Sequence, residues 1–224
     1  VNPKRERTIE YIKRLEGGGV RALFVTVDAP QLGRREKDMR NKFTKTTDVQ
    51  KDDDVNRNEG VARAISEFID SSLCWDDITW LKSITTLPII LKGVGCGIDT
   101  VLAYQMGCDG VVLSNHGGRQ LDTARSAIEI LPEAIGALDE HDSNWRSRFE
   151  VFIDGGIRRG SDVFKAIALG ATAVGIGRPV LYSLAAYGQA GVERMCSLFK
   201  EELTMVMRLM GTPTIADISE DHVL

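Results

Sequence analysis

The sequence has no long hydrophobic run and few residues of the kinds that form metal sites or disulfides. No apolar stretch approaches the roughly 20 residues that a membrane-spanning helix needs, and residues 1–10 are charged where a secretory leader has an apolar core. Three histidines and four cysteines occur, and no two cysteines have C-x-x-C spacing. The sequence therefore predicts no membrane span, no metal site, and reduced cysteines as in a cell interior.

Two nucleotide-binding signatures are also absent. No G-x-G-x-x-G opens a predicted helix and no G-x-x-x-x-G-K-[ST] occurs, which disfavours a dinucleotide-binding fold and a P-loop ATPase. The net charge of −4 disfavours nonspecific binding to nucleic acid. The chain has 224 residues, 43% hydrophobic and 27% charged, which is typical of one large globular domain.

Short apolar segments alternate with segments of helical periodicity. Strands are expected at 21–28, 87–92, 109–116, 149–154 and 172–177, and helices at 99–106, 127–138, 162–169 and 192–210. This alternation predicts a parallel sheet covered by helices, either an open doubly wound sheet or a (β/α)₈ barrel. In both architectures the functional residues gather at the carboxyl ends of the strands.

Most of the predicted strands end in a titratable residue. These ends are Asp28, Lys92, His116 and Asp154, and the last strand ends at Gly177. Plain structural turns are the alternative, but a shared site at one edge of the sheet is favoured.

Residues 44–58, TKTTDVQKDDDVNRN, break this pattern. The segment is polar and nearly free of apolar residues, so we expect a mobile surface loop. It is either a tolerated insertion or a lid over the site.

Glycine-rich turns after the last two predicted strands indicate an anion site. Gly155 and Gly156 follow the strand at 149–154, and Arg158 and a predicted N-cap, Ser161, come next. The following strand repeats the arrangement with Gly175, Gly177 and Arg178. Exposed backbone amides, a helix dipole and arginine together favour a phosphate.

His116 and Arg119 flank two glycines that let the backbone pass close to a ligand. A histidine base beside an arginine that can grip a carboxylate suits a small carboxylic acid losing a proton. Asp28 could orient the imidazole, although an N-cap or a salt bridge would also explain it. Lys92 is either a surface lysine or a contact to a cofactor or substrate.

Five segments carry a resemblance to a known family. They are LFVTVDAPQLGRREKDMRNKF, LPIILKGV, GVVLSNHGGRQLD, VFIDGGIRRGSDVFKAIALGA and VGIGRPVLY. Together they resemble the FMN-dependent L-2-hydroxy acid oxidoreductases, from about Arg21 to the end of the chain. This family includes glycolate oxidase, lactate oxidase, mandelate dehydrogenase and the cytochrome-linked flavocytochrome L-lactate dehydrogenase. The stretch VTVDAPQLGRREKDM is most similar to the cytochrome-linked member.

The resemblance implies a (β/α)₈ barrel and a role for each site residue. His116 would be the active-site base paired with Asp28, and Arg119 and Arg35 would bind the substrate carboxylate. Lys92 would lie beside the flavin ring. The implied FMN contacts are Thr26, Lys92, Ser114, Asp154, Gly155, Gly156, Ile157, Arg158, Gly177 and Arg178.

The resemblance also implies that residues 1–224 are the C-terminal portion of the barrel. The first three strands and a domain with haem b are expected to be absent from the chain, and a missing N-terminal segment or a second chain would complete the barrel. The expected reaction is L-lactate to pyruvate, with electrons passing to haem and cytochrome c, in a homotetramer of the mitochondrial intermembrane space. The alternatives are an oxygen-using glycolate or lactate oxidase of the cytoplasm or peroxisome, and a truncated homologue without catalytic activity.

Overall fold

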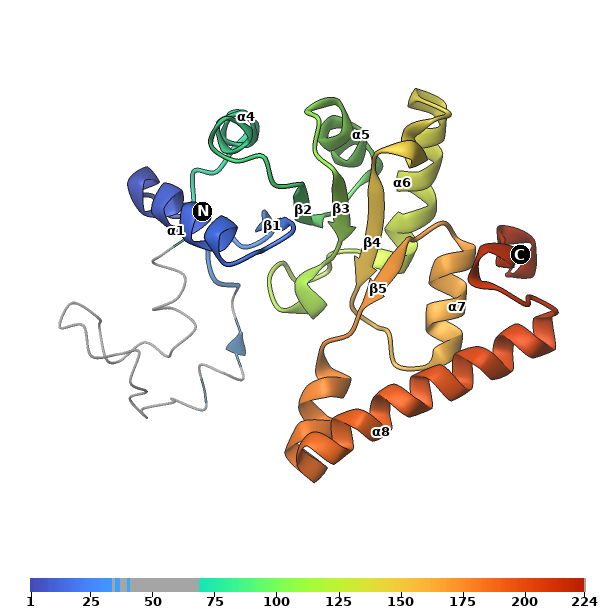
Figure 1. Ribbon diagram of the computed structural model, residues 1–224. Coiled ribbons are helices and arrows are strands. Elements are labelled where there is room, and N and C mark those ends of the chain that lie inside the picture. Colours follow the sequence, from blue (N-terminus) through green and yellow to red (C-terminus); the bar gives the residue numbers. More distant parts are fainter. Residues whose placement is uncertain (34, 37–39, 41–68, 224) are drawn as a thin grey trace.

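The described part of the chain forms a parallel sheet with helices on its outer side (Figure 1). The computed structural model describes residues 1–33, 35, 36, 40 and 69–223, so the loop expected at 44–58 lies outside the described residues. The strands are β1 Leu23–Thr26, β2 Ile89–Val94, β3 Gly110–Leu113, β4 Glu150–Asp154 and β5 Ala173–Gly175, and they pair in chain order. The α-helices are α1 Arg5–Gly17, α4 Trp75–Ile84, α5 Gly97–Gln105, α6 Ala127–His141, α7 Gly160–Ala168 and α8 Arg178–Met210. Short 3₁₀ turns are η2 His116–Gly118, η3 Trp145–Ser147, η4 Ile215–Asp217 and η5 Glu220–His222. The predicted alternation of strand and helix is confirmed, although most of the strands are shorter than expected.

The main hydrophobic core lies between the sheet and the helices. Alternate strand residues point to this outer side, and Val111, Leu113, Val151 and Ile153 are 0% exposed there. Helices α5 and α6 cover them with apolar side chains such as Ala103, Leu131 and Leu138. The outer face of the central strands is covered by helices, and their other face is turned toward the inside of the curled sheet. Their sequences are therefore nearly continuously apolar.

The sheet is curled rather than flat. Phe24 of β1 and Phe152 of β4 point to the inner face, and their ring centroids are 6.2 Å apart. Three strand spacings of about 4.8 Å would separate β1 from β4 by about 14 Å in a flat sheet. The rings can therefore meet only because the sheet bends around its inner face, as in a barrel.

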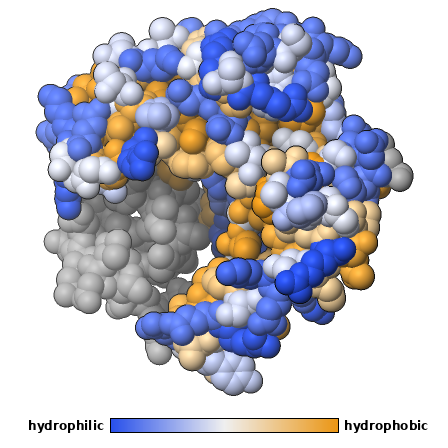
Figure 2. All heavy atoms as spheres, turned by 45° about the vertical axis from the view of Figure 1, so that its right-hand side comes forward, coloured by the Kyte–Doolittle hydropathy of each residue, from blue (hydrophilic) through white to orange (hydrophobic). Residues whose placement is uncertain are grey.

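The inner face is only partly covered by the described residues. Figure 2 shows a hollow at the centre of the view with hydrophobic atoms along its wall. The Phe24 side chain belongs to the inner face and is 55% exposed. No helix in the described ranges is both long and apolar enough to cross a membrane.

Strand β2 carries an irregularity where it passes Asp28. The register with β3 shifts between Lys92 and Val94, and Gly93 between them has φ 109°. A Cβ on Gly93 would lie 2.4 Å from Cγ of Asp28. The sequence predicted Lys92 to be the last residue of its strand, but β2 continues to Val94. The bulge leaves room for the Asp28 side chain.

Helix α7 begins earlier than the sequence predicted. Its N-cap is Arg159 rather than Ser161. The reason is Asp162, whose Oδ2 accepts hydrogen bonds from the backbone N–H groups of Arg158 (2.8 Å) and Arg159 (2.9 Å). These bonds close the turn before Ser161 is reached.

Helix α8 is longer than the predicted segment at 192–210. It starts at Arg178 with a proline in its first turn, a position that proline favours. Tyr187 and Gly188 interrupt it with non-helical backbone angles. Beyond this break it packs on α7, where a Cβ on Gly160 would lie 2.2 Å from the backbone nitrogen of Leu203.

All four cysteines are free thiols in this structure. Burial raises the pKa of Cys108 to about 11, which keeps its thiol protonated at neutral pH. Cys108 therefore acts as a small apolar side chain of the core.

We expect Gly93→Ala to lower the free energy of unfolding by about 2–4 kcal/mol, because alanine is strained at positive φ and its Cβ would collide with Asp28. Urea denaturation followed by circular dichroism measures this change.

Gly136→Ala is the matched control. Gly136 lies inside α6, and no atom lies within 4 Å of a Cβ built there. This variant should be more stable by about 0.5–1 kcal/mol. Equal effects at the two positions would contradict a special role of the bulge.

Candidate active site

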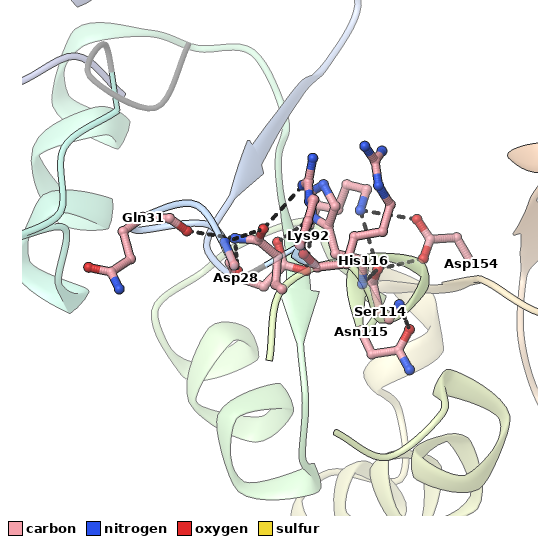
Figure 3. Close-up of polar contacts among 12 residues, drawn as sticks. Asp28, Gln31, Lys92, Ser114, Asn115, His116 and Asp154 are labelled. Atoms are coloured by element: carbon pink, nitrogen blue, oxygen red, sulfur yellow. Dashed lines mark hydrogen bonds and ion pairs between the residues drawn. The ribbon is translucent and has the colours of Figure 1, made fainter. Parts of the chain in front are cut away.

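The carboxyl ends of the strands bring the predicted site residues to one inner edge. Thr26 of β1 pairs with Lys92 of β2 in register, so both side chains share the inner face. Ser114 directly follows β3, and Asp154 is the last residue of β4. Figure 3 shows Lys92, Ser114 and Asp154 directed toward one another.

A charged network joins three of these side chains. Nζ of Lys92 lies 3.0 Å from Oδ2 of Asp154 and 3.3 Å from Oγ of Ser114. The Ser114 hydroxyl donates to Oδ1 of Asp154 and accepts from the backbone N–H of His116 at 3.0 Å. Ser114 is only 3% exposed, so this bonding satisfies a buried hydroxyl. The network fixes a lysine cation beside the start of the His116 loop.

His116 is paired with Asp28 across the edge. Its Nδ1 lies 3.1 Å from Oδ1 and 3.2 Å from Oδ2 of Asp28. His116 has φ 57°, a left-handed conformation uncommon for a residue with a side chain. The following turn is closed by Asn115, whose Oδ1 accepts from the backbone N–H of Gly118 at 3.2 Å. The pair in Figure 3 has the arrangement of a base and the carboxylate that orients it.

The two arginines predicted to bind a carboxylate lie next to each other. Nε of Arg35 donates to the backbone carbonyl of Arg119 at 3.1 Å. The Arg119 side chain is exposed and follows the His116 turn directly. Both guanidinium groups are therefore carried by backbone close to the His116–Asp28 pair.

Only part of the predicted anion site is free of hydrogen bonds to other groups of the protein that the structure describes. Gly155 and Gly156 have φ 87° and 80°, which favours glycine. The first amides of α7, however, are already hydrogen-bonded to carboxylates. Gly160 N–H donates to Oε2 of Glu202 at 2.8 Å, and this bond, with Arg159, lowers the pKa of Glu202.

Asp162 and Glu202 occupy the backbone amides of Arg158, Arg159 and Gly160, so these amides are not free to contribute to the predicted anion site. The remaining candidates are the backbone of Gly155–Ile157, the Arg158 side chain, and the turn at Gly177 and Arg178. Ile157 is 5% exposed, so its side chain serves the core and only its backbone could contact a ligand.

The turns after β3, β4 and β5 converge. Nη2 of Arg178 donates to the backbone carbonyl of Gly117. A Cβ on Gly155 would lie 3.6 Å from Oδ1 of Asn115. The glycine turns thus lie directly beside the His116 loop.

Sequence reasoning missed three residues of this edge. Gln120 bridges two loops, Gly33 lies against Gln120, and Gly93 makes room for Asp28. Gln120 stands next to Arg119 in the printed motif, but no local pattern reveals contacts to residues more than 80 positions away. Among the described residues, no group of three or more His, Cys, Asp or Glu is arranged to hold a metal ion.

Comparison with known proteins agrees with the fold. The model of the FMN-dependent dehydrogenase family matches residues 1–224. The L-lactate dehydrogenase (cytochrome) of Wickerhamomyces anomalus is 49% identical over 222 residues, covering 99% of this chain and 38% of the relative. The peroxisomal (S)-2-hydroxyacid oxidase GLO3 of Arabidopsis thaliana is 43% identical, covering 100% of this chain and 61% of the relative.

A solved structure of a flavocytochrome b2 variant with pyruvate bound matches with a TM-score of 0.85 and 48% identity. The match covers 99% of this chain and 52% of that chain. The chain thus spans between about one third and two thirds of the length of the relatives it matches. The curled sheet is the last part of a (β/α)₈ barrel, and the chain belongs to the FMN-dependent dehydrogenase family.

Proposed function

We propose that this protein oxidises an L-2-hydroxy acid with FMN, and that the favoured reaction is L-lactate to pyruvate. The observation that carries the proposal is the His116–Asp28 pair, 3.1 Å apart, beside the Lys92–Asp154 ion pair on one sheet edge. The first arrangement suits proton removal and the second provides a fixed cation. Similarity to L-lactate dehydrogenases (cytochrome) supports lactate as the substrate.

The residues at the edge fit FMN. Gly155 and Gly156 turn through positive φ, and a Cβ on Gly156 would meet no atom within 4 Å, so the backbone there is open to a phosphate. Arg158 and Arg178 supply cations beside it. Thr26, Lys92, Ser114 and Asp154 would hold the remainder, with Gly177 next to Arg178. FMN, when bound, accepts the two electrons that the substrate gives up.

His116 takes the proton released by the substrate. Because Nδ1 is directed at the carboxylate of Asp28, Nε2 is the nitrogen that can accept the proton. Asp28 then stabilises the imidazolium ion that forms.

Arg119 and Arg35 orient the substrate by its carboxylate. A guanidinium group can form two parallel hydrogen bonds to a carboxylate, which fixes both distance and angle. The Lys92 ammonium group favours negative charge on any ring system bound over the inner face.

Two electron acceptors are consistent with the family. We propose transfer to a haem b held outside this chain and from it to cytochrome c, which is supported by the similarity to L-lactate dehydrogenases (cytochrome). The second candidate is oxygen, supported by 43% identity to a peroxisomal (S)-2-hydroxyacid oxidase. The first candidate implies the mitochondrial intermembrane space, and the second a peroxisome. In either case, further strands complete the barrel, and the assembly is a homotetramer.

The proposal is tested by adding L-lactate to the FMN-loaded holoenzyme without oxygen. The flavin absorption bands should bleach, and cytochrome c should restore them faster than oxygen does. Faster restoration by oxygen would assign the protein to the oxidases. Flavin bands that stay unchanged with L-lactate, glycolate and mandelate would contradict the function itself.

His116→Gln should slow flavin reduction by L-lactate about 10²–10⁴-fold, because the general base is lost. FMN should remain bound, since the cofactor contacts are unchanged. Stopped-flow absorbance measures the rate. His141→Gln, an exposed substitution at the end of α6, is the control and should leave the rate unchanged.

Arg119→Lys should lower kcat/KM about 10–100-fold despite the retained charge, because the two-pronged contact is lost. Arg194→Lys on the exposed side of α8, where Arg194 pairs with Glu201 at 3.0 Å, is the control. Equal kinetics for both variants would exclude Arg119 from carboxylate binding.

A further inference from the structure

The side-chain amide of Gln120 is fully bonded to the loop that follows β1. Its Oε1 accepts from the backbone N–H of Gly33 at 3.2 Å and from Nη2 of Arg35 at 3.3 Å. Its Nε2 donates to the backbone carbonyls of Asp28 at 3.3 Å and Gln31 at 2.8 Å. An amide offers two donors and two acceptor lone pairs, so every bonding position is used. If the amide were reversed, its NH₂ group would face the N–H donors of Gly33 and Arg35. This fixes the orientation of the amide.

A second observation shows that the same two loops touch through their backbones. A Cβ on Gly33 would lie 2.5 Å from the carbonyl oxygen of Gln120 and 2.6 Å from that of Arg119. The Arg119 carbonyl also accepts from Nε of Arg35 at 3.1 Å. The contact is therefore close enough to exclude a side chain at position 33.

Each loop carries half of two functional pairs. Asp28 and Arg35 lie on the loop after β1, and His116 and Arg119 lie on the loop after β3. A displacement of one loop against the other changes the Asp28–His116 contact and the spacing of the two arginines together. Figure 3 shows Asp28 on the first loop beside His116 on the second, with Gln31 farther from His116 on the first loop.

We infer that Gln120 is a positioning residue that sets both pairs by fixing one loop against the other. The inference rests on the proposed function, because it assigns Gln120 a role in that reaction. In the proposed reaction Gln120 contacts neither the proton that His116 takes nor the carboxylate of the substrate. It acts through Asp28 and Arg35.

The test compares Gln120→Met with Gln105→Met in the FMN-loaded holoenzyme. Methionine has a similar length and keeps none of the polar bonds. Gln105 is exposed at the C-terminal end of α5. This end of the helix lies at the opposite edge of the sheet from the site. Three quantities are measured: the dissociation constant of pyruvate from flavin difference spectra, the rate of flavin reduction by L-lactate, and the dissociation constant of FMN.

Gln120→Met should raise the pyruvate dissociation constant at least fivefold and slow reduction about 10–100-fold, because small displacements of reacting groups cost large factors in rate. The FMN dissociation constant should stay within twofold, since none of the groups bonded to the Gln120 amide is among the proposed FMN contacts. Gln105→Met should match the wild type in all three. A purely structural role would lower the melting temperature and leave pyruvate affinity and reduction rate unchanged, which would overturn the inference.

Two further measurements keep the test independent of folding and of the reaction. Gly33→Ala leaves Gln120 intact but separates the loops, so it should give the same combination of weaker pyruvate binding, slower reduction and unchanged FMN binding. Hydrogen exchange at the Gly33 amide should accelerate at least tenfold in Gln120→Met, with or without FMN. An unchanged exchange rate overturns the inference about Gln120, whereas a wild-type holoenzyme that no 2-hydroxy acid reduces overturns only the proposed function.

Discussion

The contact between Asp28 and His116 is the interaction around which this edge is built. It joins residues 88 positions apart, at 3.1 Å and 3.2 Å between Nδ1 and the two carboxylate oxygens. Neighbouring features make room for it or hold it in place. Gly93 has no side chain where Asp28 lies, and His116 adopts an uncommon left-handed conformation that turns its ring toward the carboxylate.

The surrounding polar groups fix both partners of this contact. Ser114 accepts from the backbone N–H of His116 and donates to Asp154, which links the histidine loop to the Lys92 cation. Gln120 holds the backbone of Asp28 from the other side. A base needs a defined position more than it needs many contacts, because catalytic groups act over hydrogen-bond distances. The edge meets this requirement with bonds that cross between strands, together with the Ser114–His116 bond within one loop.

The sequence was sufficient to predict the parallel sheet, because buried strands and amphipathic helices alternate in it. Alternation along β2 and β4 also explains why Lys92 and Asp154 share the inner face. The start of α7 was only partly predictable, because Asp162 is a local capping residue whereas Glu202 reaches the first amides from α8. Gly93 and Gln120 escaped notice for a related reason. Their roles depend on Asp28, and contacts between distant positions leave no periodic pattern in a single sequence.

The claim that Asp28 acts through His116 is tested most directly by a double-mutant cycle on the rate of flavin reduction by L-lactate. The cycle compares Asp28→Asn, His116→Gln and the double variant with the wild-type holoenzyme. If Asp28 acts only by orienting and stabilising the imidazole, the double variant should be no slower than His116→Gln alone. A double variant slower by the full product of the two single effects would show that the residues act independently, and would contradict the account.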